Sequence, residues 1–213
     1  MNDPADAATE AATEAATDPA LDAFLGLVAE KGYAAVTLRE VGAAAGLGVA
    51  ELYRRYRDKP ALVAGFLRRV DDAVLAGTAT ALDPEETARD RLFDVMMRRY
   101  DALRPHRAVV TAVRRAAGRD PALALALAPA LRRSMAAMLE AAAVSSDGLP
   151  GVLRQGGLLA LHHAVSRVFE GDDTADLSKT MAALDSRLKG AEKWAQRLDK
   201  YGKTDKPAEP AAA

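Results

Sequence analysis

The sequence predicts an all-α protein with a short N-terminal helical domain and a longer C-terminal helical bundle. Of the 213 residues, 50% are hydrophobic but only 5% are aromatic, so the core must consist mainly of Ala, Leu and Val. Ala, Leu and Arg are good helix formers. Apolar residues recur at spacings of three and four along most of the chain, whereas the alternation typical of strands is rare. Proline and glycine separate these stretches, as they do at helix ends.

Length and composition also limit the class of protein. A chain of 213 residues forms one large or two modest domains and can bury a substantial core. The absence of cysteine excludes disulfides, thiol catalysis and Cys-ligated zinc. No apolar run approaches the length of a membrane span, and the N-terminus lacks the pattern of a signal peptide. We therefore expect a soluble, cytoplasmic protein with no membrane span.

The two ends of the chain differ from the rest. Residues 1–20 contain five acidic and no basic residues, and residues 5–18 repeat AATE with no apolar residue larger than Ala. Such a stretch has nothing to bury, so we expect residues 1–19 to be a disordered acidic tail. Residues 201–213 are rich in Ala, Pro and Lys, and we expect a second disordered tail there.

Two helices joined by a tight turn are predicted after a first helix at about residues 20–31. Thr37 and Glu40 form a capping box at the start of one helix. Gly46 can adopt the positive φ that ends it. Leu52 and Tyr56 continue the apolar face through a short second helix, and the opposite face carries Arg54, Arg55 and Arg57. This pattern is typical of a helix-turn-helix, although an ordinary αα-corner with a solvated arginine face would look similar.

The same segment resembles the TetR family of bacterial regulators. The resemblance covers about residues 20–66 and rests on Gly32-Tyr33, Thr37, Val41, Ala45-Gly46, Leu52-Tyr53, Tyr56, Lys59 and Leu62. It implies a homodimer that binds a double-stranded DNA operator, with a second half that binds a small effector and thereby loosens the DNA-binding half. It also implies DNA-contacting roles for Thr37, Arg39, Ala50, Glu51, Tyr53, Arg55 and Lys59.

The chain departs from the family pattern at three places. Gly48 stands where a Ser or Thr cap is usual, Ala50-Glu51 replaces Gly with Ser or Thr, and Pro60 replaces an acid. These departures put the usual phosphate contacts in doubt. The charge of residues 21–70, eight Lys or Arg against five acids, is consistent with DNA binding without proving it.

The rest of the chain, residues 67–200, is expected to form a ligand-binding and dimerisation bundle. Asp58 and Pro60 begin a long helix that runs to about Leu82 and joins the two halves. Further helices are expected to begin at Asp83-Pro84 and at Asp120-Pro121. A strongly apolar helix covers residues 152–169, and a last one follows Asp172.

Two sets of residues in this bundle are candidate sites. An apolar effector pocket is expected from side chains that could face inward, namely Val95, Met96, Leu103, Val109, Val113, Leu131, Met135, Leu159 and Phe169. Methionine suits such adaptable pockets. A heptad seam in the last helix predicts a dimer interface that contains Leu177, Met181, Leu184 and Leu188.

Enzymatic chemistry has little support in the sequence. No phosphate-binding loop, HExxH or GxSxG motif occurs, so we expect no catalytic residues, no metal and no cofactor. His162 and His163 point about 100° apart on a helix and cannot chelate one ion together. One alternative stays open: the segment DLSKTMAALDSRL is weakly similar to lipid-binding ubiquinone-biosynthesis proteins that share the TetR fold. Such a protein would bind a lipid or isoprenoid without binding DNA.

Overall fold

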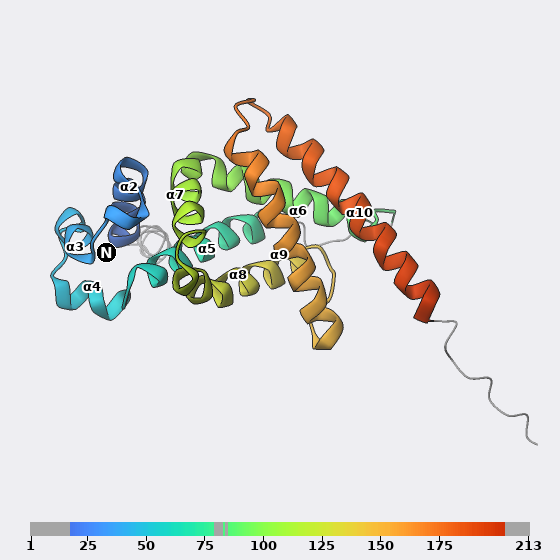
Figure 1. The fold of residues 1–213 in the computed structure, drawn as a ribbon, viewed down its shortest axis with the longest axis horizontal. Coiled ribbons are helices and arrows are strands. Elements are labelled where there is room, and N and C mark those ends of the chain that lie inside the picture. The colour runs from blue at the N-terminus through green and yellow to red at the C-terminus, as the bar shows by residue number, and fades with distance from the viewer. Residues whose placement is uncertain (1–17, 79–82, 84, 203–213) are drawn as a thin grey trace, which may run out of the picture. The chain divides into compact units, whose positions relative to one another are not determined.

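The computed structural model describes residues 18–78, 83 and 85–202, with the side chains of 193–202 left aside. These residues form α-helices and two short 3₁₀ turns and contain no strand (Figure 1). The all-α prediction is therefore confirmed. The elements are α2 (Pro19–Lys31), η1 (Tyr33–Ala35), α3 (Leu38–Ala45), α4 (Val49–Arg55), α5 (Lys59–Ala76), α6 (Ala88–Leu103), η2 (Arg104–His106), α7 (Arg107–Ala117), α8 (Pro121–Ala141), α9 (Gly148–Glu170) and α10 (Ser178–Gly202).

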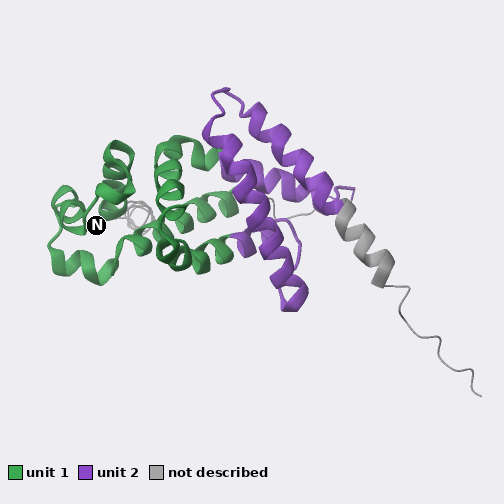
Figure 2. Ribbon diagram, in the orientation of Figure 1, with its two compact units in different colours: residues 1–77, 101–134 green, residues 78–100, 135–213 purple. Residues whose placement is uncertain are grey.

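The chain divides into two compact units, which Figure 2 shows in different colours. Unit 1 contains residues 1–77 and 101–134, and unit 2 contains residues 78–100 and 135–213. The division predicted from the sequence at residues 66 and 67 stays a prediction. The proposed tails fall almost entirely on residues 1–17 and 203–213, which lie outside the described residues.

Unit 1 is built around the first helix and the helix-turn-helix. The Asp18 carboxylate caps α2 by accepting the N–H groups of Ala20 and Leu21 at 3.0 and 3.2 Å. The apolar stripe predicted for this helix is buried, and the helix packs against α3, α5 and α7. The core includes Phe24, Val28, Val36, Val41, Leu52, Leu62 and Phe66. Burial of these side chains fixes the position of α3 and α4.

Helix α5 begins as expected and ends sooner. Asp58 caps it by accepting the N–H of Ala61 at 2.8 Å, and Pro60 lies in its first turn. The helix ends at Ala76 with Gly77 as its cap, rather than at about Leu82. Glycine has a high cost in a helix interior and often follows a helix end.

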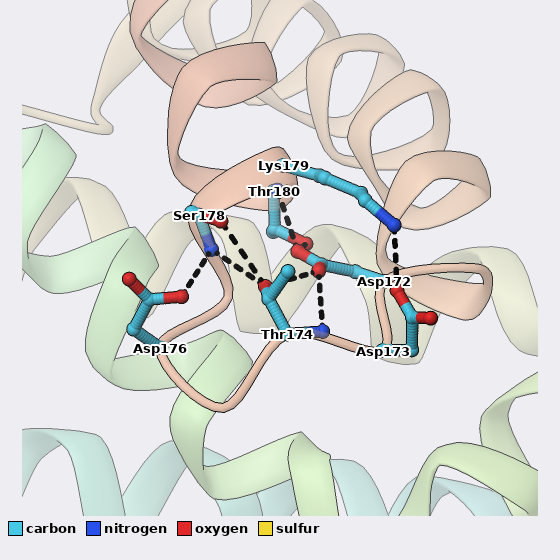
Figure 3. Close-up of polar contacts among 7 residues, drawn as sticks. All are labelled: Asp172, Asp173, Thr174, Asp176, Ser178, Lys179 and Thr180. Carbon is cyan, nitrogen blue, oxygen red and sulfur yellow. Dashed lines mark hydrogen bonds and ion pairs between the residues drawn. The ribbon is translucent and has the colours of Figure 1, made fainter.

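Unit 2 shows two further shifts in helix boundaries. Helix α6 begins at Ala88, because Thr87 caps it by accepting the N–H of Asp90 at 3.2 Å. Helix α10 begins at Ser178, not directly after Asp172. The buried Asp172 carboxylate accepts hydrogen bonds from Thr174 and Thr180, including the backbone N–H of Thr180 at 2.7 Å (Figure 3). Asp172 therefore holds the loop against the first turn of α10.

Three of the four residues in the predicted heptad seam, in α10 and just before it, are buried in the single chain. Leu177, Leu184 and Leu188 are buried within the single chain, where α10 packs against α9. The dimer interface that the heptad predicts at Leu177, Met181, Leu184 and Leu188 stays a prediction. Met181, which is 41% exposed, is the one predicted interface residue left on the surface.

Helix α8 differs from the expectation that no apolar run approaches the length of a membrane span. By length and composition, α8 is long and apolar enough to cross a membrane. A single helix of this kind is weak evidence for a membrane span, since the core helix of a soluble protein passes the same test. In α8, Leu123, Leu127, Met135 and Met138 are buried at the spacing of one helix face, and 33% of the apolar window is buried.

Candidate nucleic-acid interface

The turn between α3 and α4 has the geometry that the sequence predicts. The Thr37 hydroxyl accepts the N–H of Glu40 at 3.3 Å, and the Glu40 carboxylate accepts the N–H of Thr37 at 2.8 Å. Gly46 ends α3 in the left-handed region with φ of 68°. A Cβ on Gly42 would lie 3.1 Å from the carbonyl oxygen of Leu47, so the two segments approach closely here. The turn is therefore held by backbone constraints at both ends.

Helix α4 buries one face and exposes the other. Leu52 is buried on its inner side, and Tyr56 is buried just beyond its end. Outward lie Val49, which is 64% exposed, Tyr53, which is 59% exposed, and the exposed Ala50 and Arg54. Val49 and Tyr53 are four positions apart on α4, so their exposed apolar surfaces adjoin. A short helix that presents such a face can enter the major groove of DNA.

Glu51 and Arg55 on α4 form an ion pair. The Arg55 guanidinium donates to the Glu51 carboxylate at 2.8 Å across one helical turn. The repulsion between this carboxylate and DNA phosphates is therefore partly offset by a neighbouring positive charge. The charges of Glu51 and Arg55 therefore partly neutralise each other on the surface of α4.

The inner side of the motif is anchored by Tyr56. Its hydroxyl donates to the Asp18 carboxylate at 2.5 Å, which connects the end of α4 to the start of α2. The ring lies against Gly65 of α5, where an added Cβ would come within 2.9 Å of it. Burial, followed by the hydrogen bond to Asp18, raises the pKa of Tyr56 to about 12. Tyr56 therefore stays neutral and fixes the orientation of α4.

The Lys59 ammonium group already contacts Tyr33 within unit 1. Its Nζ donates to the carbonyl oxygen of Tyr33 at 3.0 Å and lies 4.5 Å from the centre of the Tyr33 ring. Partial burial lowers the pKa of Lys59. A phosphate contact at this position would have to share the ammonium group with these partners. Thr37 and Arg39 are exposed at the start of α3, on the same motif.

Val49 is a residue of the candidate interface that the sequence did not predict. Val49 is three positions before the buried Leu52, so helical spacing alone would assign it to the core. Its exposure adds a methyl-bearing side chain to the outer face of α4. The signal that could have revealed it is Gly48, which starts α4 without a side-chain cap directly before Val49.

The residues predicted to form an effector pocket fall in both units. Leu103, Val109, Val113 and Leu131 belong to unit 1, and Val95, Met96, Met135, Leu159 and Phe169 belong to unit 2. Leu159, Val113 and Leu131 are partly buried and the rest are buried. Their joint role as a pocket stays a prediction.

Unit 2 also contains a buried polar cluster beside Phe169. The Tyr100 hydroxyl lies 3.0 Å from Nδ1 of His162, and the two rings stack. Burial, together with the charge of Arg99, lowers the pKa of His162 to about 3. His163 is exposed. No group of three His, Cys, Asp or Glu placed to hold a metal occurs within the described part of the chain.

The geometry defines the class of protein as an all-α chain with a helix-turn-helix whose second helix presents an apolar and basic face. Comparisons with known proteins agree with this. Residues 20–65 match the family described as bacterial regulatory proteins, tetR family. No curated protein matches the sequence significantly.

Solved structures of the same fold cover most of the chain. A TetR transcriptional regulator from Nitrosomonas europaea is 19% identical with a TM-score of 0.66, and the match covers 82% of this chain and 97% of that one. A TetR transcriptional regulator from Rhodococcus sp. is 21% identical with a TM-score of 0.59 and corresponding coverage of 80% and 93%. The chain therefore has the fold of TetR-family regulators, and its helix-turn-helix segment matches the model of that family over residues 20–65.

Proposed function

We propose that the chain is a TetR-like transcriptional regulator, acting as a homodimeric repressor that an effector releases from its operator. The observation that carries the proposal is the outer face of α4, where Val49, Tyr53 and Arg54 are exposed while Leu52 and Tyr56 anchor the helix behind them. A rigid helix with outward apolar and basic groups suits both thymine methyl groups and base or phosphate acceptors. We expect Thr37, Arg39, Ala50, Glu51, Tyr53, Arg55 and Lys59 to contact DNA.

The homodimer would use the exposed face of α9. Leu149, Val152 and Leu153 are all exposed near the start of this helix, and nothing lies within 4 Å of a Cβ added to Gly156 one turn later. A two-fold dimer pairs the same surface on both subunits, and small residues allow two helices to approach closely. Met181 on α10 is a further exposed apolar residue in unit 2. This face would add to the predicted interface residues of α10.

The effector would be a small apolar molecule held by the predicted pocket residues. Met96, Met135 and Phe169 provide an adaptable apolar environment in unit 2. In a dimer, a change in the separation of the two α4 helices is sufficient to lose the fit to two half-sites. No step of this proposal requires catalysis or a cofactor, and it places the protein in the cytoplasm with DNA.

The test is to incubate the purified protein with random genomic fragments and to sequence those that it retains. A regulator should enrich fragments with a palindromic motif whose half-sites are about one helical turn, or a multiple of it, apart. Retention without any enriched motif would contradict the proposal. If the protein retains no DNA but its melting temperature rises with an isoprenoid quinone, the lipid-binding alternative replaces it, because a ligand that binds only the folded form stabilises it.

A further inference from the structure

A groove of about 830 Å³ lies inside unit 1, and no residue of α3 or α4 lines it. One wall is formed by the end of α2, the turn η1 and the start of α5, including Lys31, Tyr33 and Lys59. The other wall is formed by the end of α7 and the start of α8, including Arg115 and Arg119. None of the residues predicted to form an effector pocket lines this basic groove.

The inner surface of the basic groove is mostly small and apolar. Alanines from both walls line it, among them Ala35, Ala112, Ala116 and Ala122, together with Pro60 and Leu123. Short side chains leave the space open, and their methyl groups offer apolar surface to a ligand. An aliphatic chain or a small ring would bury apolar area there.

The charges around the basic groove are predominantly positive. It is lined by Lys31, Lys59, Arg115 and Arg119, and among the described residues that line it Asp120 is the one carboxylate. Asp120 is occupied, because it caps α8 by accepting the N–H groups of Ala122 and Leu123 at 2.9 and 3.2 Å. Lys31 is paired with Glu40.

Arg115 and Arg119 remain available. Both are exposed, and neither forms an ion pair with any residue that the structure describes. They lie four positions apart, at the end of α7 and just after it. Two guanidinium groups that line a largely apolar groove match an anionic head group, to which arginine binds with charge-assisted hydrogen bonds.

We infer that the basic groove binds a small amphipathic anion, a carboxylate or phosphate ester with an apolar chain or ring. The head group would contact Arg115 and Arg119, and the apolar part would lie over the alanines and Pro60. The occupant would contact both walls and so fix η1 and the start of α5 relative to α7. If the proposed function holds, this site lets a metabolic anion adjust the helix-turn-helix domain independently of an apolar effector.

The direct test is calorimetry with simple probes on the full chain without DNA. Octanoate should bind with one site per chain, whereas octanol, octyltrimethylammonium and inorganic phosphate should each bind at least about tenfold more weakly, because each lacks the charge or the apolar part. Phosphate binding as tightly as octanoate would overturn the amphipathic character of the site. Absence of octanoate binding would overturn the inference entirely.

Single substitutions test whether octanoate binds in the basic groove. Arg115→Gln and Arg119→Gln should each lower octanoate affinity about tenfold. Arg133→Gln is the matched control, since it removes the same charge from an exposed position of unit 1 outside the groove, and it should change affinity less than about twofold. Ala122→Leu should reduce binding by filling the groove from an exposed position. Equal losses in all four variants, or none in the first two, would show that octanoate binds elsewhere.

Two readouts separate this inference from the proposed function. Octanoate binding needs no DNA, so it can succeed in a protein that retains no DNA fragment, in which case only the proposed function fails. In a DNA-binding protein, octanoate should change the affinity for the enriched fragment in the wild type and not in Arg119→Gln. An unchanged affinity in the wild type would overturn the regulatory part of the inference.

Discussion

At the scale of single residues, Glu51 and Arg55 on α4 are coupled by an ion pair at 2.8 Å. Glu51→Ala should keep or raise affinity for random duplex, because it removes a charge that phosphates repel. If Glu51 accepts a hydrogen bond from cytosine, the variant should also lose about 1–3 kcal/mol of preference for C·G at one position of each half-site.

The measurement for Glu51 is binding of wild type and variant to operators that carry each of the four base pairs at that position. Glu30→Ala is the matched control, since Glu30 is an exposed carboxylate in the same unit outside α4. Equal selectivity in wild type and Glu51→Ala would leave Glu51 as a residue that favours the positive end of the α4 dipole.

The lowered pKa of His162 predicts how the free energy of unfolding depends on pH. The buried ring has a pKa of about 3, so in the folded state it is neutral, whereas in the unfolded state it takes up a proton below its ordinary pKa of 6.5. The stabilisation that comes from neutral, buried His162 is therefore fully present above pH 6.5 and is lost as the pH falls toward 3. Between pH 7.5 and pH 5 the free energy of unfolding should fall by about 2 kcal/mol from this group.

Denaturant titrations at these two pH values test the prediction. His162→Asn should keep only the smaller loss that comes from His106, whose pKa partial burial also lowers. His163→Gln is the control, because His163 is exposed on the same helix. A wild type whose stability is the same at both pH values would contradict a neutral, buried His162.

At the scale of helices, the α4–α5 corner depends on Tyr56. Tyr56→Phe removes the hydrogen bond to Asp18 and should lower the free energy of unfolding by about 1–2 kcal/mol. Gly65→Ala should cost about 1–3 kcal/mol, because the new Cβ would lie 2.9 Å from the Tyr56 ring. Gly26→Ala is the control: its Cβ would meet nothing within 4 Å, so it should stabilise α2 by about 1 kcal/mol.

Thermal and denaturant unfolding of the three variants measure these changes. Equal effects of Gly65→Ala and Gly26→Ala would show that the Tyr56 ring does not press on α5. Loss of DNA selectivity in Tyr56→Phe at a temperature where it is fully folded would show that the Asp18 contact orients α4 as well as stabilising it.

The sequence predicted best those helix ends that have a local capping pattern, whereas the end of α5 and the starts of α6 and α10 differ from the prediction. The Thr37–Glu40 box, Gly46 and the Asp58 cap of α5 each depend on residues within four positions of one another, and all three are present. The α10 seam depends instead on which neighbour covers the helix. A heptad of leucines is equally suited to α9 of the same chain and to a second subunit, so spacing could not decide between them.

The candidate nucleic-acid interface was also predicted from the sequence only in part. The sequence located α4 and its arginines, but not the exposure of Val49 or the contact between Lys59 and the carbonyl oxygen of Tyr33. Both depend on how η1 and α5 pack in three dimensions. The basic groove likewise brings together residues near 31, 59, 115 and 122, a proximity that no local pattern shows.

At the scale of the whole molecule, the central question is assembly. Leu153→Glu should convert the dimer to monomers without unfolding the subunit, because Leu153 is 69% exposed on α9. Leu184→Glu should instead unfold unit 2, because Leu184 is completely buried. Leu125→Glu, at a residue 76% exposed on α8, is the control for adding charge to an exposed leucine. Light scattering at micromolar concentration gives the mass, and a monomeric wild type would contradict the dimer.

The most direct test of the account is the affinity of the wild type for an enriched DNA fragment and for a scrambled duplex of the same composition, measured at several salt concentrations. The account predicts that the enriched fragment binds at least about a thousandfold more tightly, and that Tyr53→Ala loses much of this ratio. Arg68→Ala, an exposed arginine on α5, should leave the ratio unchanged. Equal affinity of the wild type for both duplexes would contradict a DNA-reading role for α4.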